Sequence, residues 1–514
     1  MTENTVIIIG AGLAGLATGC YAQMNGYRSR IFEHHDQPGG VAAAWRRGVF
    51  LIDGGIHFAW SHKPGTELHE VYRELGIVPA NRFSDLTTYG RFMDEASGIQ
   101  VEISQDLDRF AEELKALSPA DAKIVDELIA GARAMQGIDM STVGMAKPPE
   151  LSSALDQVRD MWAMRRLLRY IVGKLGQPVA DYAQAAQAPW MRTLLENLFL
   201  PEAPVYFICM LLALLADGQL GLIEGGSTAF VQAIEKRYKD LGGEITYRAK
   251  VEEILVEEDR AVGVRLTGGA GPGFEHRADA VVSAADGYST IFRMLGGGYV
   301  DDKIRERYET WPRFKPLLMV NYGVTREFPD DPPFISMALE RPLTIAGEPV
   351  KGFMIRLFNY SPRFAPPGKT VVQIELETEW EYWHNLQRED RAGYDAEKER
   401  AAAAILDQLE VLYPGISSQV EVTDIATPYT WWRYTLNDRG SWEGWLITPQ
   451  AMRTAVSRRL PGLAGFVMAG QWVMPGGGVP PCLLSGQHAV QLLCYDDGKP
   501  FRATGDRSEV NAAG

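Results

Sequence analysis

The first 35 residues show the apolar pattern of a strand, a helix and a second strand. Residues 6–9, Val-Ile-Ile-Ile, are continuously apolar and β-branched, as in a central parallel strand that is covered on both faces. Residues 13–24 repeat small and apolar side chains at i, i+4 spacing, which predicts a helix that stops at Asn25-Gly26. Residues 29–32 predict a second strand that leads into Glu33. The pattern therefore predicts a parallel β-α-β unit with an acid after its second strand.

The turn between this first strand and the helix has the GxGxxG spacing, with Gly10, Gly12 and Gly15. The three glycines permit, in order, a tight turn, close approach of the backbone to a diphosphate, and packing of the helix on the strand. The free N–H groups at the helix start attract the diphosphate, and Glu33 can accept hydrogen bonds from a ribose. His34 follows in place of an arginine, which argues against the 2′-phosphate of NADP. We therefore predict an adenine dinucleotide held by Gly10, Gly12, Leu13, Ala14, Gly15, Glu33 and His34.

Four segments of the chain resemble the family of FAD-dependent amine oxidases and phytoene desaturase-like oxidoreductases, which includes carotenoid isomerases and retinol saturases. They are the glycine-rich start with its continuation through residue 58, and residues 221–254, 278–286 and 465–493. The resemblance implies an α/β fold, in which a discontinuous Rossmann-type FAD-binding domain carries an inserted mixed α+β substrate domain. It also implies FAD as the cofactor, because a domain that binds only NAD has no need of the last segment.

The resemblance also implies roles for residues outside the first turn. In the family, a Gly-Gly pair soon after the ribose acid lies along the diphosphate and the ribityl chain, which is the position of Gly39, Gly40 and Val41. The arginine that usually follows this pair is absent, and Arg46 is the candidate to replace it. The residue at the position of Val251 meets the adenine through its backbone in the family.

The last segment runs from an apolar strand into Gly470 and Gln471. The family usually has an acid at the second position to bind the ribityl hydroxyls, and the amide of Gln471 can also hydrogen-bond a hydroxyl. A Pro-Gly-Gly-Gly turn then leads through Gly478 to a helix that begins near Val479. The N-terminus of such a helix is well placed to stabilise negative charge on a reduced flavin.

His57 is the candidate catalytic residue. It follows Gly54 and Gly55, which allow the backbone to approach the flavin ring, and its imidazole can donate or accept a proton near neutral pH. The alternative is a structural histidine bonded to backbone. An aromatic group is predicted to wall an apolar substrate pocket or to form a cage over the flavin, although aromatic clusters also form plain core. It consists of Trp431, Trp432, Tyr434 and Trp472.

The order of these segments predicts how the chain divides. Residues 1–85, 218–295 and 455–497 are expected to form the FAD-binding domain, and residues 86–217, largely helical, and 296–454, mixed, to form the substrate domain. Residues 498–514 are predicted to be a flexible tail. The substrate is expected to meet the flavin between the two domains.

Composition limits the partners. The net charge of −15 argues against nucleic acid as a partner, and no metal-ligand spacing is present. Four scattered cysteines fit a reducing cytoplasm. Residues 159–176 are basic and amphipathic, which is typical of a helix on an anionic membrane surface and equally of a solvated helix. The apolar residues 203–216 predict either a buried helix or the wall of a lipophilic tunnel.

We therefore expect an FAD-dependent oxidoreductase that dehydrogenates an apolar substrate, such as a polyene or isoprenoid, by hydride transfer to flavin N5. Oxygen or a quinone would then take the electrons. Isomerisation or saturation of a double bond on the same fold, and amine oxidation, are the alternatives that remain open.

Overall fold

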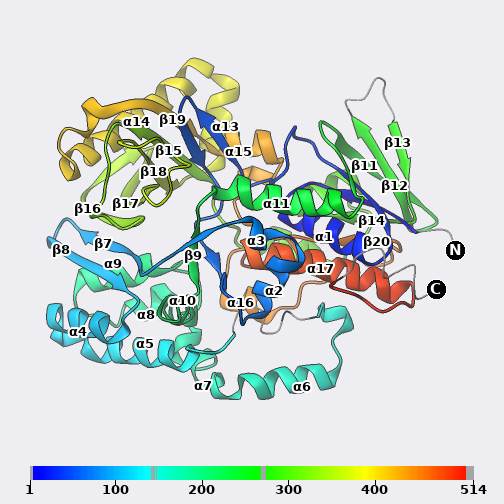
Figure 1. The fold of residues 1–514 in the computed structure, drawn as a ribbon, viewed down its shortest axis with the longest axis horizontal. Helices are drawn as coiled ribbons and strands as arrows, with labels where there is room; N and C mark the ends of the chain where they lie inside the picture. The colour runs from blue at the N-terminus through cyan, green and yellow to red at the C-terminus, as the bar shows by residue number, and fades with distance from the viewer. Residues whose placement is uncertain (1–3, 140–144, 146, 268–273, 505–514) are drawn as a thin grey trace.

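Two sheets organise the computed structural model, which describes residues 4–139, 145, 147–267 and 274–504. Figure 1 shows a smaller sheet on the right, near both ends of the chain, and a larger sheet at the upper left. A group of helices lies below the larger sheet. The fold is thus α/β with mixed sheets and helices, as predicted.

The smaller sheet has five strands, and all neighbouring strands run parallel. In spatial order they are β10 (Glu244–Thr246), β2 (Arg28–Phe32), β1 (Thr5–Ile9), β14 (Ala280–Ser283) and β20 (Phe466–Met468). The beginning, the middle and the end of the chain all contribute strands. The sheet is therefore discontinuous in sequence.

Strand β1 is buried on both faces, which explains its continuous apolar run. On one face, Val6 and Ile8 pack in a core with several helices, which include α1 (Leu13–Met24), α11 (Gly226–Asp240) and α17 (Val479–Asp496). On the other face, Ile7 and Ile9 pack against a three-stranded antiparallel sheet. Its strands are β11 (Lys250–Glu257), β12 (Arg260–Thr267) and β13 (Phe274–Arg277).

The larger sheet has seven strands and is antiparallel except where β16 and β7 pair. In order, they are β19 (Val420–Ala426), β15 (Leu317–Val324), β18 (Thr370–Glu377), β17 (Glu348–Leu357), β16 (Phe334–Ile345), β7 (Thr88–Asp94) and β8 (Ile99–Ser104). Apolar residues from its strands form one core with α13 (Trp380–Glu389) and α14 (Arg391–Leu412). Since β7 and β8 precede α11 in the chain, segments from both sides of α11 build this sheet.

Helices between β8 and β9 (Leu220–Ile223) form a separate apolar core. They include α4 (Leu107–Leu117), α5 (Ala122–Met135), α8 (Val179–Ala183), α9 (Pro189–Leu198) and α10 (Tyr206–Ala216). Helix α10 is the predicted apolar helix; Ile208, Cys209 and Leu212 are fully buried, while Tyr206, Phe207 and Met210 border the cavity described below. The two interpretations of residues 203–216 therefore describe different faces of one helix.

The basic stretch at 159–176 is not one helix. It is divided between α6 (Ala154–Ala163), α7 (Leu168–Ile171) and short 3₁₀ turns at Met164–Arg166 and Lys174–Gly176. Its neighbourhood carries several exposed apolar side chains, namely Leu155, Val158, Trp162 and Val172. Among the residues that the structure describes, no helix is both long and apolar enough to cross a bilayer.

The first residues of the predicted tail contact the end of α1. Lys499 Nζ donates to Asn25 O at 3.0 Å, and Arg502 N donates to Asn25 Oδ1 at 2.7 Å. These bonds hold the chain against the end of α1. Residues 505–514 lie outside the described residues.

Short elements complete the described chain. They are β3 (Ala44–Arg47), β4 (Phe50–Asp53), β5 (Ala59–Trp60), β6 (Phe83–Asp85), β9 (Leu220–Ile223), α2 (Glu67–Glu74), α3 (Ile77–Ala80), α12 (Asp302–Thr310), α15 (Pro428–Thr435) and α16 (Pro449–Arg453).

Candidate active site

One cavity of about 1970 Å³ reaches from the first glycine turn to the larger sheet. It brings together most of the residues that the sequence predicted for cofactor and substrate. These are Gly10, Gly12, Leu13, Ala14, Glu33, Gly39, Gly40, Val41, Gly55, His57, Trp431, Tyr434, Gly470, Gln471, Trp472, Gly478 and Val479. Gly15, His34, Arg46, Val251 and Trp432 do not line it.

The first glycine turn leaves the start of α1 open to the cavity. Gly10 has φ +93°, a conformation that side chains disfavour. A Cβ on Gly15 would overlap the carbonyl oxygen of Gly10, so this glycine acts by letting the helix pack on the strand. The N-cap Gly12 has no side-chain cap, and the first turn of α1 contains no acid. The unfilled N–H groups therefore fit an anionic diphosphate.

The second glycine pair lies beside the first. Gly39 N donates to Ala11 O at 2.9 Å, and the φ values of Gly39 and Gly40 are +127° and +60°. A Cβ on Gly40 would lie 3.5 Å from the Cα of Gly12. Backbone without side chains thus borders the cavity from two directions, which fits the diphosphate of a dinucleotide.

Glu33 joins the glycine turn to the turn after β2. Its Oε2 accepts from Ala11 N at 2.6 Å, and its Oε1 accepts from His35 N at 2.7 Å. Burial raises the pKa of Glu33, against the lowering effect of these backbone donors. Each carboxylate oxygen can accept a second hydrogen bond, so the group remains able to bind ribose hydroxyls from the cavity.

Four predicted residues lie away from the cavity for identifiable reasons. Arg46 is exposed on the β3–β4 hairpin, and its neighbour Arg47 borders the cavity instead, because adjacent strand residues point to opposite faces. Val251 packs in the core between the smaller sheet and the three-stranded sheet, and the partly buried His34 follows Glu33 without reaching the cavity. Trp432 packs against Trp380 and Tyr429, 6.0 and 5.5 Å between ring centroids.

The Asp53-Gly-Gly-Ile-His57 loop is pinned by the start of α11. Asp53 Oδ2 accepts from Ser227 N at 2.7 Å, and Ser227 Oγ accepts from Ile56 N at 2.6 Å. A Cβ on Gly55 would lie 2.6 Å from Ser227 Oγ, so only glycine fits this approach. The loop thereby presents His57 to the cavity in a fixed position.

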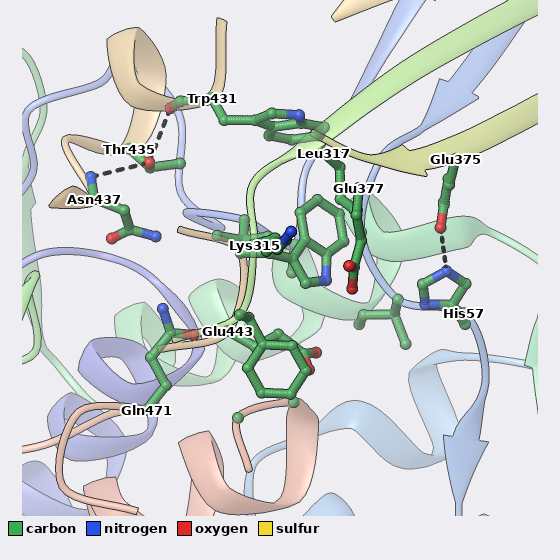
Figure 2. A pocket seen from close by; sticks show the side chains of 18 of the residues that line it. His57, Lys315, Leu317, Glu375, Glu377, Trp431, Thr435, Asn437, Glu443 and Gln471 are labelled. Carbon is green, nitrogen blue, oxygen red and sulfur yellow. Dashed lines mark hydrogen bonds and ion pairs between the residues drawn. The ribbon is translucent and has the colours of Figure 1, made fainter. Parts of the chain in front are cut away.

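His57 contacts the carboxylate of Glu375, and Arg356 binds the other oxygen of this carboxylate. Its Nε2 lies 2.8 Å from Glu375 Oε2, as Figure 2 shows. Arg356 Nη1 donates to Glu375 Oε1 at 3.1 Å and to Gln373 Oε1 at 2.8 Å, and Gln373 Nε2 donates to Asp53 O at 2.8 Å. Burial favours the neutral acid, but His57 and Arg356 outweigh it and lower the pKa of Glu375 to about 2. The ionised carboxylate fixes a proton on Nε2 and turns Nδ1 away from it.

The predicted aromatic group does not form a cage. Trp431 packs edge-on against Trp45 and Trp442 and borders the cavity. Tyr434 stands edge-on to His35, close to the dinucleotide end. The ring of Trp472 is buried beside that of Trp445, at 5.0 Å, so only part of the predicted set is available to a substrate.

The helical segment between β8 and β9 contributes mainly apolar side chains to one part of the cavity, called the apolar arm here, together with the polar Glu196 and Asn197. Its lining includes Met164, Ile171, Leu198, Phe199, Phe207 and Met210, all from the helical segment between β8 and β9. Phe199 and Phe207 stack with 5.4 Å between ring centroids. This apolar arm can bury a long hydrocarbon chain.

Sequence reasoning missed Glu375, Arg356 and Glu443. Gln373, Glu375 and Glu377 alternate with apolar residues in β18, which is a signal of one polar strand face. Glu443 stands between Trp442 and Trp445, an acid among large aromatic residues. Both signals are local, but neither shows that the acids face a cavity.

The chain matches the model of the flavin containing amine oxidoreductase family over residues 13–494, and it belongs to that family. It is 23% identical to the chloroplastic prolycopene isomerase of Arabidopsis thaliana, covering 96% of this chain and 83% of that one. It is 25% identical to the neurosporene-forming phytoene desaturase of Rhodobacter capsulatus, over 96% and 95% of the two chains. Among solved structures, cyclohexylamine oxidase from Brevibacterium oxydans is similar, with a TM-score of 0.58, 15% identity, and coverage of 97% and 100%.

The protein is therefore an FAD-dependent oxidoreductase. The cofactor fits the open N-terminus of α1, the glycines at 10, 12, 39 and 40, and the carboxylate of Glu33. Gly470 and Gln471 border the same cavity. When bound, FAD supplies the acceptor for a hydride. The chain's own residues must then position the substrate and handle the second hydrogen, which leaves as a proton.

Proposed function

We propose that the protein desaturates an apolar substrate, of the polyene or isoprenoid class, by removing two hydrogens from neighbouring carbon atoms. One hydrogen leaves as a hydride to flavin N5, and the other leaves as a proton. The apolar arm of the cavity carries this proposal, because its aliphatic and aromatic lining suits a hydrocarbon chain. The names of the desaturase and isomerase relatives support the same substrate class.

His57 is the residue that we propose to take the proton. Its Nε2 is held at Glu375, so Nδ1 is the nitrogen available as a base. The carboxylate also stabilises the imidazolium that results, and Arg356 keeps the carboxylate ionised and in place. The loop from Asp53 supplies the rigidity that such a proton transfer needs.

Two alternatives use the same fold. Isomerisation or saturation of a double bond would use the same apolar arm and a reduced cofactor. Amine oxidation would need a polar pocket for the substrate nitrogen, and the burial of Trp472 in the core argues against the aromatic cage that we considered for it.

The surroundings of the protein follow from two further features. All four cysteines, Cys20, Cys209, Cys482 and Cys494, are unpaired, which favours a reducing cytoplasm.

The exposed Leu155, Val158 and Trp162 on α6 are followed in the chain by Arg165, Arg169 and Lys174, a combination that suits peripheral contact with an anionic lipid surface. Met164 and Ile171 of the same stretch line the cavity, so an apolar substrate has a short route from such a surface. Oxygen or a quinone is the proposed final acceptor.

The test is anaerobic reduction of the bound flavin. Purified protein with FAD is mixed without oxygen with a polyene such as phytoene, and separately with a set of alkyl amines. Bleaching of the visible flavin bands by the polyene, with formation of a product that has one more double bond, supports the proposal. Bleaching by amines alone contradicts it. Geometric isomerisation without a net change in the flavin favours the isomerase alternative.

A further inference from the structure

Glu443 is a carboxyl group at the cavity to which the proposed reaction gives no task. Its neighbours Trp442 and Trp445 are buried on either side of it. Trp445 Nε1 donates to Trp472 O at 3.0 Å, and Gly476 N donates to Trp445 O at 3.1 Å. The backbone that carries Glu443 is thus fixed against the loop that precedes α17.

Two glycines of this loop lie against Glu443. A Cβ on Gly477 would overlap Glu443, and a Cβ on Gly478 would lie 3.7 Å from Glu443 Oε1. The carboxyl group therefore lies beside the N-terminus of α17. The first turn of this helix contains no acid, and its N-cap Gly478 has no side-chain cap. The helix dipole favours negative charge at this end, next to Glu443.

The charged surroundings of Glu443 come from several elements. Glu375 of β18 faces it, with His57 and Arg356 beyond, and the Cys482 thiol of α17 lies close by. Lys315 and Glu377 border the same part of the cavity (Figure 2). Within the described residues, the carboxyl group has no hydrogen-bond donor to stabilise its ionised form.

Burial, followed by repulsion from Glu375, raises the pKa of Glu443 to about 8. Its environment thus differs from that of Glu375, whose cationic partners keep it ionised. Near neutral pH a neutral Glu443 therefore stands near an ionised Glu375, and the two carboxyl groups have separate tasks.

We propose that Glu443 couples reduction of the bound flavin to a proton, because a neutral Glu443 permits the added negative charge whereas an ionised Glu443 opposes it. Hydride transfer brings two electrons and one proton to the cofactor. Where Glu443 is already neutral, reduction of the flavin adds no further proton to it. Where Glu443 is ionised, the new charge draws one proton from solvent onto its carboxylate. The proposal rests on FAD binding and holds for any hydride donor.

The experiment measures the midpoint potential of the bound FAD from about pH 6 to about pH 10, with a chemical reductant and no substrate. Above about pH 8, the potential of the wild-type protein should fall more steeply with pH than that of Glu443→Gln. The expected difference is about 30 mV per pH unit, since one extra proton accompanies two electrons. Glu74→Gln is the control, because burial also raises the pKa of Glu74 but this residue lies outside the cavity.

Equal slopes for the wild-type protein and Glu443→Gln overturn the proposal. If this variant does not retain FAD, the wild-type protein alone decides the question. Reduction at about pH 9 in weak buffer, with a one-electron reductant that releases no proton and with a pH indicator, should consume close to two protons per flavin, and consumption of only one overturns the proposal. Because no substrate is used, neither result bears on the proposed desaturation.

Discussion

His57 Nε2 lies 2.8 Å from Glu375 Oε2, and the other oxygen of the same carboxylate lies 3.1 Å from Nη1 of buried Arg356. The three side chains come from the Asp53 loop, β18 and β17, and they form one chain of contacts from the cavity into the larger sheet. Proton handling at His57 therefore depends also on Arg356, which does not line the cavity.

Replacing His57 tests its role as the base. His57→Gln should lower the rate at saturating substrate by about 10²–10⁴-fold, because a positioned general base contributes this much. The measurement is single-turnover bleaching of the flavin. His62→Gln is the matched control, since His62 Nε2 also lies 2.8 Å from a carboxylate, that of Asp85, but outside the cavity. Equal rates for the two variants would make His57 a structural residue.

Glu375 should make stability depend on acid pH. Its pKa is about 2 in the folded protein, below the value of about 4.3 for an unfolded chain. A depressed pKa contributes stability that is complete above the unfolded value and is lost as the pH falls toward 2, a contribution on the order of 3 kcal/mol. Unfolding by urea at about pH 7 and at about pH 3 measures it. The difference in the free energy of unfolding between wild type and Glu375→Gln should become smaller at the lower pH. A difference that stays constant contradicts the lowered pKa of Glu375.

Glu33→Ala should weaken FAD binding by about 10–100-fold, the value of one or two hydrogen bonds to a charged group. The change also frees Ala11 N, which Glu33 holds in the glycine turn. Flavin remaining after dialysis, read from its absorbance, is the measurement. Glu244→Ala is the control, because Glu244 is exposed on the neighbouring β10 and pairs only with Arg30 among the described residues. Full retention of flavin by Glu33→Ala would contradict the proposal that Glu33 binds the ribose hydroxyls of FAD.

Gly15→Ala should unfold the FAD-binding domain or abolish its binding of FAD, because the new Cβ would overlap Gly10 O. Forcing an extra atom into a packed contact costs about 1–3 kcal/mol, and more where backbone must shift. Thermal unfolding and flavin content report the effect. At Gly298, a Cβ would meet Leu295 O at an ordinary 3.6 Å, so Gly298→Ala should behave as wild type. A Gly15→Ala protein that is normal in both measurements would show that α1 can shift away from β1.

Trp162→Ser should reduce sedimentation with anionic lipid vesicles about tenfold, since burial of one large apolar side chain is worth about 1.5–3 kcal/mol. Val411→Ser on α14 is the control, an equally exposed apolar residue away from the basic stretch. Loss of binding in both variants, or in neither, would argue against α6 as the contact surface.

The sequence predicted those parts of the fold that depend on local pattern. The run Val6–Ile9, the glycine spacing and Glu33 specify strand, turn and acid through neighbouring residues alone, and the structure has each at the predicted place. The helix at Val479 was predictable for the same reason.

Other parts of the site depend on contacts between distant segments. Glu375 alternates with apolar residues as a surface strand would, and only pairing of β18 with β15 and β17 buries it. The ring of Trp472 could point to either side of its chain until Trp445 is placed beside it. Arg47 rather than the predicted Arg46 borders the cavity, because of a β3–β4 pairing that the sequence pattern does not reveal.

The smaller sheet closes only when β20 and α17, near the end of the chain, join β14 and α1. During synthesis the ribosome emits the diphosphate turn first and the residues around Gly470 last. A nascent polypeptide therefore cannot retain its prosthetic group until β20 and α17 have been synthesised, so flavin acquisition follows the emergence of these two elements.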